Sequence, residues 1–463
     1  MEPQPTVARD EEVALDTDVF KAFQRLLPAE FIAQALRQAN VRENNRVYTS
    51  AVVMWLMVWQ RLQSEGTLEA AVLELLRSLP SSFWSKPCKR LREAAEEGGA
   101  SLSNHTGAFN QGRQGLSGPV VEICCDHAFA QLMPVAEGQR PAFFLDGTTV
   151  RMPHARTLVE AYPPTRNQHG VSHWPIMRML VAHDLYTGLA MRPAWGPVNG
   201  EQAVSEQDLL ECAISRLPER SVLCGDANFG VFSVAYAAAE HNHPVVLRLT
   251  EVRARRLAAG EWRDGVDKRV VWKPSREDRR SHPDLPADAC VEGRLVVRLV
   301  QPSNGDQAFL LALFTTLPDA SEKIVELYGK RWNIEVDLRT LKGQLRLEEL
   351  SSTTPQMIAK EINLAILSYN LVRSVMYLTA RKSGLEPRAF SFTKVRNVLD
   401  AFLPLIAAAT DERQRRRLTK TMLDCLERTR LYRRQRPSAP RAVWPTPKSY
   451  PAQHNKLQCN GSN

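Results

Sequence analysis

The sequence predicts an α/β fold, in which a mixed β-sheet lies between helical regions at the two ends of the chain. Three observations predict it. Apolar residues recur at helical spacing from about 17 to 135, short β-like runs separated by turns begin near 141, and a helical, basic region with a Pro-rich tail ends the chain. A length of 463 residues exceeds one ordinary core, so we expect two to four domains.

The composition indicates a globular protein with a polyanionic partner. Hydrophobic residues make up 44% of the chain and charged residues 24%, which is not a disordered composition. The net charge is +9, and such an excess favours nucleic acid. The stretch 411–448 holds twelve Lys or Arg against four Asp or Glu. A solvated charged helix is the alternative interpretation of that stretch.

The chain carries no obvious signal for export, for a membrane or for a nucleotide. Its eight cysteines form no CxxC pair, which favours a reducing compartment. The N-terminus lacks a basic region followed by an apolar one, and the apolar run 51–59 is too short to span a bilayer. No GxxxxGK[ST] element is present. We therefore expect a cytoplasmic, nucleoid-associated protein with no membrane and no nucleotide cofactor.

The N-terminal region, 1–135, reads as a helical domain. Phe20, Phe23 and Leu26 recur at helical spacing. Residues 49–62 predict a buried helix capped by Thr49 or Ser50. Four arginines of this region could place a helix in a groove of DNA, so we expect the domain to bind DNA ends; they are Arg37, Arg42, Arg46 and Arg61.

The central region, 136–380, reads as the sheet-containing core. The predicted strands are 142–145, 174–181 and 189–195, then 221–224 and 244–249 alternating with helices at 206–217 and 231–240. Three hairpin-linked strands followed by alternating helix and strand are typical of an RNase H-like mixed sheet. A β-rich insertion is expected at about 250–316. One long helix is expected from 318 to 345 and another from 358 to 378, before a helical and basic tail region, 381–463.

Two strand-end aspartates and one helical glutamate form a candidate catalytic set. Asp146 and Asp226 each end an apolar strand-like run, and Glu335 lies on the predicted helix 318–345. Carboxylates in this arrangement hold pairs of divalent metal ions that cut and join phosphodiesters. Each aspartate adjoins a glycine, however, so a turn residue is the alternative interpretation for either alone.

Polar residues are spaced regularly around Glu335. Tyr328, Arg331, Glu335 and Lys342 follow the pattern Y-x2-R-x3-E-x6-K, which would place them along one side of a continuous helix. Asp337 falls about 200° around that helix from Glu335 and should point away. Asp184, at a predicted turn, is the main rival as a metal ligand.

This signature, with the two strand-end aspartates, resembles that of DDE-type bacterial transposases of the insertion-sequence-4 family, over roughly residues 140–375. The resemblance implies an RNase H-like core in which Asp146, Asp226 and Glu335 hold two Mg²⁺ ions, with Mn²⁺ able to substitute. It implies that Tyr328, Arg331 and Lys342 contact terminal phosphates of a transposon end. It also implies double-stranded DNA as partner, a homodimer when DNA is bound, and cut-and-paste transposition.

The chain departs from the family in two places. Family members stack a flipped base on an aromatic side chain of the insertion, whereas here Phe309 and Phe314 are expected to belong to the core. Asp226 is followed by Ala227 rather than by the arginine that often stands there.

Further DNA contacts and two rival functions remain open from the sequence. Arg433, Arg434 and Arg436 in the tail are expected to follow a phosphate backbone. One rival function is a structure-selective nuclease of the same core that cuts without strand transfer. The other is a non-catalytic DNA-binding descendant of a transposase.

Overall fold

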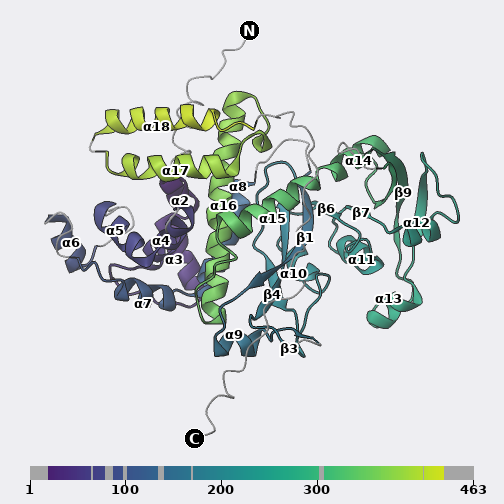
Figure 1. Cartoon of the computed structure of the whole chain (residues 1–463), viewed down its shortest axis with the longest axis horizontal. Helices are drawn as coiled ribbons and strands as arrows, with labels where there is room; N and C mark the ends of the chain where they lie inside the picture. Colours follow the sequence, from purple (N-terminus) through teal and green to yellow (C-terminus); the bar gives the residue numbers. More distant parts are fainter. Residues whose placement is uncertain are drawn as a thin grey trace, which may run out of the picture.

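A computed structural model describes residues 19–63, 66–78, 87–96, 102–133, 140–167, 170–301, 307–409 and 411–431. Helices occupy one side of the molecule and a large sheet the other, and the long helix α16 (Pro355–Ser383) runs between them (Figure 1). The expected α/β class, with a mixed sheet flanked by helical regions from both ends of the chain, is confirmed.

The N-terminal region is helical, as predicted. Thr49 accepts a hydrogen bond from the backbone N–H of Val52 and caps α4, whose side chains are almost all buried. The helices are α2 (Val19–Leu26), α3 (Ala29–Gln38), α4 (Ser50–Leu62), α5 (Leu68–Ser78), α6 (Lys89–Glu96), α7 (Gly107–Gly115) and α8 (Gly118–Leu132).

The sheet has eight strands in the order β5-β4-β1-β6-β7-β10-β9-β8. Strand β1 pairs antiparallel with β4 and parallel with β6, and β6 pairs parallel with β7. The strands are β1 (Ala142–Arg151), β4 (Ile176–Asp184), β5 (Ala194–Pro197), β6 (Val222–Gly225), β7 (Val245–Arg248), β8 (Asp267–Trp272), β9 (Val291–Val300) and β10 (Phe309–Thr315). The first five, in the order β5-β4-β1-β6-β7, form the expected RNase H-like mixed arrangement.

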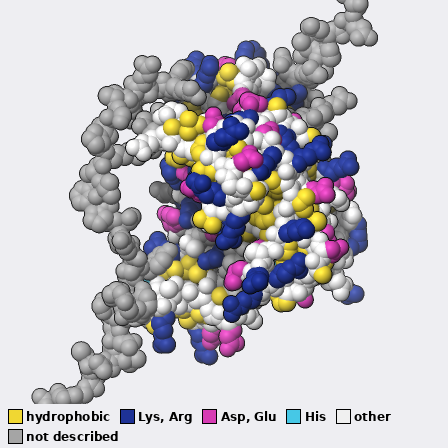
Figure 2. Space-filling model, turned by 90° about the vertical axis from the view of Figure 1, so that its right-hand side faces the viewer, with side chains coloured by type: hydrophobic (Ala, Val, Ile, Leu, Met, Phe, Trp, Pro, Cys, Tyr) yellow, Lys and Arg dark blue, Asp and Glu magenta, His cyan; other side chains and the backbone are white. Residues whose placement is uncertain are grey.

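The β-rich segment expected at 250–316 extends this same sheet. Strand β10 pairs with β7, β9 pairs with β10, and β8 forms the outer edge. The short helices α12 (Glu251–Leu257) and α13 (Arg276–Ser281) accompany these strands. Figure 2 views the molecule from this side and shows Lys and Arg side chains spread over it among apolar ones.

The remaining elements complete the core and the C-terminal region. Most lie where the sequence predicts, but the helix expected over 206–217 is only the five-residue α10, and residue 206 lies in the loop before it. The elements are α9 (Arg156–Ala161), the β2–β3 hairpin (Arg166–Asn167 and Gly170–Val171), α10 (Leu210–Ile214), α11 (Phe232–Glu240), the 3₁₀ helix η2 (Pro387–Ala389), α17 (Phe392–Ala407) and α18 (Glu412–Glu427).

The single helix expected over 318–345 was wrong. The structure has two helices, α14 (Ser321–Gly329) and α15 (Trp332–Gln344). Between them the N–H of Asn333 bonds to the carbonyl of Lys330, and the N–H of Ile334 to that of Arg331. These three-residue bonds tighten the chain, because a 3₁₀-type turn replaces the four-residue ladder. Tyr328 therefore belongs to a different helix from Glu335.

One hydrophobic cluster joins regions that are far apart in the sequence. It includes side chains of α4, α8, α16, α17 and α18, with most of α16 buried among them. Within the described ranges, no helix combines the length and the apolar character needed to cross a bilayer. The N-terminal and C-terminal helices thus share their packing with α16, and the domain limits given above stay a prediction.

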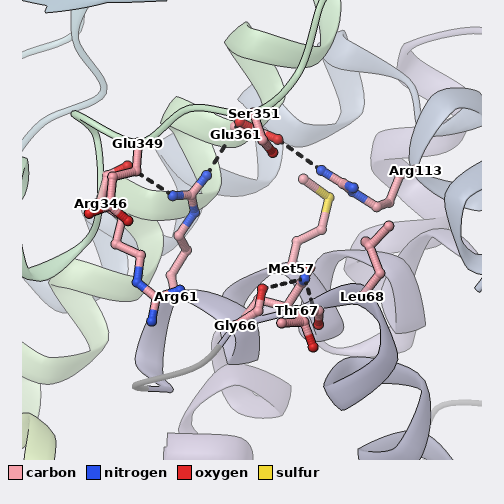
Figure 3. Close-up of a pocket in the computed structure, with 11 residues that line it drawn as sticks. Met57, Arg61, Gly66, Thr67, Leu68, Arg113, Arg346, Glu349, Ser351 and Glu361 are labelled. Carbon is pink, nitrogen blue, oxygen red and sulfur yellow. Dashed lines mark hydrogen bonds and ion pairs between the residues drawn. The ribbon is translucent and has the colours of Figure 1, made fainter. Parts of the chain in front are cut away.

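Buried ion pairs tie the N-terminal helices to α16 around a cavity of about 300 Å³ (Figure 3). Glu361 of α16 is 2% exposed and accepts a hydrogen bond of 2.8 Å from Arg113 of α7. Arg61 of α4 lies 3.4 Å from the second oxygen of Glu361. Lys360 donates to three carbonyl groups at the end of α7, including that of Arg113. These contacts fix the helical layer against α16.

Candidate active site

Three side chains stand in one row across three adjacent parallel strands, where β6 and β7 end. The strand expected over 142–145 is longer than predicted, because β1 continues to Arg151, and Asp146 lies within this strand rather than at its end. Leu145 of β1 pairs with Gly225 of β6, and Gly225 pairs with Leu247 of β7. The residues that directly follow these three in the sequence are Asp146, Asp226 and Arg248. Residues in register on neighbouring strands point to the same face. The sheet therefore brings the two predicted aspartates together and adds an arginine beside them.

The row lies on the sheet face that α14 and α15 cover. Two residues earlier on each strand, Phe144, Cys224 and Val246 pack in a cluster with Tyr328 of α14 and Ile334, which begins α15. Side chains two apart on a strand share a face, so the carboxylates lie on the face that these helices cover. This packing, rather than one continuous helix, places Tyr328 and Arg331 near the aspartates.

The environment of Asp146 is strongly anionic. Burial, together with the charges of Asp226 and Glu206, raises the pKa of Asp146 to about 6. The Gly147 N–H and the Arg331 guanidinium oppose this rise. A carboxylate held among other carboxylates lacks compensating charge, and a divalent cation would supply it.

Asp226 and Asp184 both stand at turns, but they differ in exposure. Asp226 is half-buried and accepts one bond of 2.9 Å, from the N–H of Asn228. Asp184 is 2% exposed and accepts bonds from Tyr186 N–H and from both the N–H and hydroxyl of Thr187. Asp184 therefore stabilises the β4 turn, whereas the carboxylate of Asp226 is more accessible and accepts one hydrogen bond.

Glu335 is engaged with Arg331 in this structure. Arg331 Nη1 donates to Glu335 Oε1 at 2.9 Å, and both side chains are about one-third exposed. Across the described parts of the chain, no three His, Cys, Asp or Glu side chains are close enough to hold one metal ion. Helix α15 contacts β1, so the carboxylate must turn from Arg331 toward the aspartates to complete a three-acid site.

The other residues of the signature occupy different settings. Tyr328 is 5% exposed, lies with its ring 6.1 Å from that of Phe144, and has a buried hydroxyl without a hydrogen-bond partner among the described residues. Burial raises the pKa of Tyr328 to about 12, although Arg248 and Arg331 act against it. Lys342 is half-buried in the last turn of α15. The Tyr328 hydroxyl lies close enough to the Arg248 guanidinium for that group to lower its pKa, and a hydroxyl beside a guanidinium suits an anionic group.

Arg248 is a candidate site residue that the sequence reasoning missed. Its guanidinium lies over the Phe309 ring at 5.7 Å, and no carboxylate of the described residues lies within ion-pair distance. The sequence pattern that identifies Arg248 is the one used for the aspartates, because Arg248 directly follows an apolar strand run, 245–247. Phe309 itself is 40% exposed, so its expected place in the core was wrong, whereas Phe314 is fully buried as expected.

Asp337 anchors α15 from the side opposite Glu335. It is fully buried and forms ion pairs with Arg373 of α16 and, at 2.8 Å, with Arg388 of η2. Burial opposes ionisation of Asp337, but these two guanidiniums hold its pKa below the ordinary value. The expectation that Asp337 points away from the site agrees with this packing. Arg433, Arg434 and Arg436 lie outside the described residues.

Two comparisons with known proteins agree with this geometry. Residues 137–371 match the family model described as the transposase DDE domain. The chain is also 24% identical over 327 residues to the transposase InsG for insertion sequence element IS4 of Escherichia coli strain K12, which covers 68% of this chain and 70% of that protein. The family match begins just before β1 and ends within α16, so it includes every residue of the row.

Proposed function

Because this chain belongs to the family of transposases with a DDE domain, we propose that it cuts DNA at the ends of a mobile element and joins the freed 3′-hydroxyls to target DNA. The observation that carries the proposal is the row of Asp146, within β1, and Asp226, directly after the neighbouring strand β6, next to the helix that bears Glu335. We assign these three carboxylates as the catalytic residues.

Family members generally use divalent metals, and the donor set here fits them. Asp146, Asp226 and Glu335 offer only carboxylate oxygens, which Mg²⁺ and Mn²⁺ prefer. We propose that they hold two such ions. When bound, the ions would neutralise charge on the attacking and leaving oxygens of the phosphodiester. Burial is the main cause of the raised pKa of Asp146, and the nearby charges of Asp226 and Glu206 add to it, so a cation bound at this position would be favoured.

The cationic residues around the row bind and orient the DNA. Arg331, Arg248 and Lys342 supply positive charge, and the Tyr328 hydroxyl supplies a donor, for phosphates at the cut end. When Arg331 engages a phosphate, Glu335 loses its partner and is free to turn toward the aspartates. Arg248 takes the phosphate-binding role that the alanine after Asp226 cannot perform.

The reaction proceeds by two in-line displacements at phosphorus. Water attacks the phosphodiester at the element's end, and the departing group is the 3′-hydroxyl of the element. That hydroxyl then attacks a phosphodiester of the target, so one phosphodiester is formed for each one broken. No ATP and no covalent protein intermediate are required.

The rest of the chain recognises DNA and brings two ends together. We propose that 1–135 binds the element's ends, that 136–380 is the catalytic core, and that 381–463 adds a basic surface with Arg433, Arg434 and Arg436. Cutting two ends in one complex needs at least a dimer on double-stranded DNA.

The decisive experiment uses the gene with its native flanking DNA as substrate. With Mg²⁺ or Mn²⁺, the wild-type protein should nick at discrete flank positions and join the ends to a target plasmid. Glu335→Gln should bind the flanks and do neither. Nicks without any joined product would instead identify a nuclease, and tight binding without cleavage by either protein would identify a non-catalytic DNA-binding protein.

The DNA contacts are tested by the salt dependence of binding. Each lost phosphate contact lowers the slope of log K against log salt by about 0.9. Arg248→Gln should therefore lower the slope by about 1, and neutralising Arg433, Arg434 and Arg436 together by up to about 3. Arg276→Gln, on the short helix α13, is the matched control. An unchanged slope for either set removes those residues from the DNA interface.

A further inference from the structure

Helix α7 presents an uncharged polar face to solvent. On its inner side Phe109 is fully buried, and Arg113 forms an ion pair with Glu361 of α16. Gln111 and Gln114 are exposed on the opposite side, because residues three apart lie on one face of a helix. The other exposed positions of this outer face are small residues: Gly107, Ala108 and Gly115. The two amide groups therefore project beyond their neighbours.

The outer face of α7 is held on a rigid support. A Cβ atom at Gly112 would lie 3.0 Å from Val53 of α4 and 3.2 Å from Tyr48, so the helix packs closely against the start of α4. At the end of α7, Lys360 donates to three backbone carbonyl groups. The amides are thus presented from a fixed backbone, which precise recognition requires.

Two arginines lie beside the outer face. Arg42 and Arg46, from the loop between α3 and α4, line a hollow of about 150 Å³ together with Gln111. Both arginines are exposed, and neither forms an ion pair with any residue that the structure describes. The carboxylate in this hollow, Glu43, accepts the backbone N–H of Ser50 at 2.6 Å. Unpaired positive charge at the edge of an uncharged face favours a polyanionic partner.

The sequence around α7 also lacks negative charge. No Asp or Glu occurs from residue 98 to residue 121, so no side chain of this helix repels phosphates. The outer face carries no apolar side chain larger than that of Ala108, whereas large exposed apolar side chains mark surfaces that bind proteins. The composition of the face therefore fits nucleic acid rather than a second protein.

The major groove of double-stranded DNA matches this helix in size and in chemistry. The groove is about 12 Å wide and admits an α-helix, and a glutamine side chain pairs with both N6 and N7 of adenine. Arginines beside such a helix contact the phosphates that border the groove. We propose that α7 reads base sequence in the major groove of the element's end, with Gln111 and Gln114 on base edges and Arg42 and Arg46 on phosphates.

This inference rests on the proposed function, in which residues 1–135 bind the element's ends, and it names the helix that recognises their sequence. Of the other arginines of this region that were expected on DNA, Arg61 is instead paired within the molecule.

The first test compares the affinity of the full-length protein for native flanking DNA with its affinity for a duplex of the same composition and shuffled sequence. Gln111→Ala and Gln114→Ala should each lower the ratio of these affinities about 10-fold, as expected for loss of one bidentate base contact. The salt dependence should not change, because neither variant removes a charge. Gln34→Ala removes an exposed amide from α3 and is the matched control, with the wild-type ratio.

The arginines should behave in the opposite way. Arg42→Gln and Arg46→Gln should weaken binding to both duplexes equally and lower the slope of log K against log salt by about 1 each.

A second test changes the DNA instead of the protein. Replacing single purines of the flanking DNA by 7-deazapurines removes the N7 acceptor from the major groove. Wild-type binding should weaken at discrete positions. At one of them, Gln111→Ala or Gln114→Ala should bind the normal and the modified duplex alike.

A folded protein with both glutamines replaced by alanine that keeps the wild-type affinity ratio would overturn the inference. If that protein also changes its oligomeric state without DNA, the outer face is a contact between two copies of the chain. If it keeps the ratio and still nicks the flanks, only the role of α7 fails. A wild-type protein that neither prefers nor nicks the native flanking DNA contradicts the proposed function itself.

Discussion

At the scale of single residues, neighbours decide what each aspartate does. The Asp184 carboxylate accepts hydrogen bonds within the turn after β4, and the charge of Asp337 is neutralised by Arg373 and Arg388. Asp146 alone stands among like charges, with its pKa raised to about 6. Residue type is the same in all three, so only the surroundings separate a structural aspartate from a candidate ligand.

This difference predicts how stability depends on pH when no metal is present. The pKa of Asp146 is raised from 3.8 to about 6, so the folded protein holds a proton that the unfolded chain has lost in this window. Wild-type stability should therefore fall as pH rises from about 4 to 6. Asp146→Asn removes this dependence and should be more stable at pH 7 by on the order of 1–2 kcal/mol.

Thermal unfolding in EDTA at several pH values measures the effect. The difference between Asp146→Asn and the wild type should close below about pH 4, where both side chains are neutral. A variant less stable than the wild type at pH 7 would show that Asp146 has a compensating partner.

At the scale of elements, the site depends on the junction of α14 and α15 and on how α15 is held. The break at residues 330–331 directs Tyr328 into the sheet-facing cluster, while Arg331 and Glu335 remain half-exposed at the start of α15. On the opposite side of α15, Asp337 pairs with α16 and η2. The orientation of Glu335 is thus set by a buried charge two residues away.

We therefore expect Asp337→Asn to damage both stability and catalysis. It leaves Arg373 and Arg388 buried without their counter-charge, which typically costs about 3–5 kcal/mol. Urea denaturation should report this loss, and nicking should fall because α15 is no longer fixed. Glu335→Gln is the matched control on the same helix: it should abolish nicking while changing stability by less than about 0.5 kcal/mol. Equal stability of the two variants would contradict the anchoring role of Asp337.

At the scale of the whole molecule, α16 links the helices from the two ends of the chain. Its buried length packs against helices from both ends of the chain, and Lys360 and Glu361 bond to α4 and α7 (Figure 3). The cores of the helical layer and of α16 are therefore one cluster. DNA bound by the N-terminal helices would be positioned relative to the row of Asp146, Asp226 and Arg248 through these contacts with α16.

The Glu361→Gln variant tests the contacts between α16 and the N-terminal helices. It leaves Arg61 and Arg113 without the carboxylate they share, and we expect a loss of about 3–5 kcal/mol in the free energy of unfolding. Limited proteolysis should then cut between the N-terminal helices and the sheet more readily than in the wild type. Glu349→Gln, exposed and lining the same cavity, should change stability by less than about 0.5 kcal/mol. Equal effects of Glu361→Gln and Glu349→Gln on the free energy of unfolding would show that the buried ion pairs do not hold the N-terminal helices against α16.

The sequence by itself determined the α/β class, the apolar strand runs that lead to Asp146 and Asp226, the buried helix capped by Thr49 and the family signature around Glu335. These follow from local periodicity and spacing, which are written along the chain. It could not place Arg248 beside the aspartates, bring Glu206 near Asp146 or divide the helix at residue 330. Strand register, loop tethering and packing against the sheet decided those features, because each depends on contacts between residues far apart in the sequence.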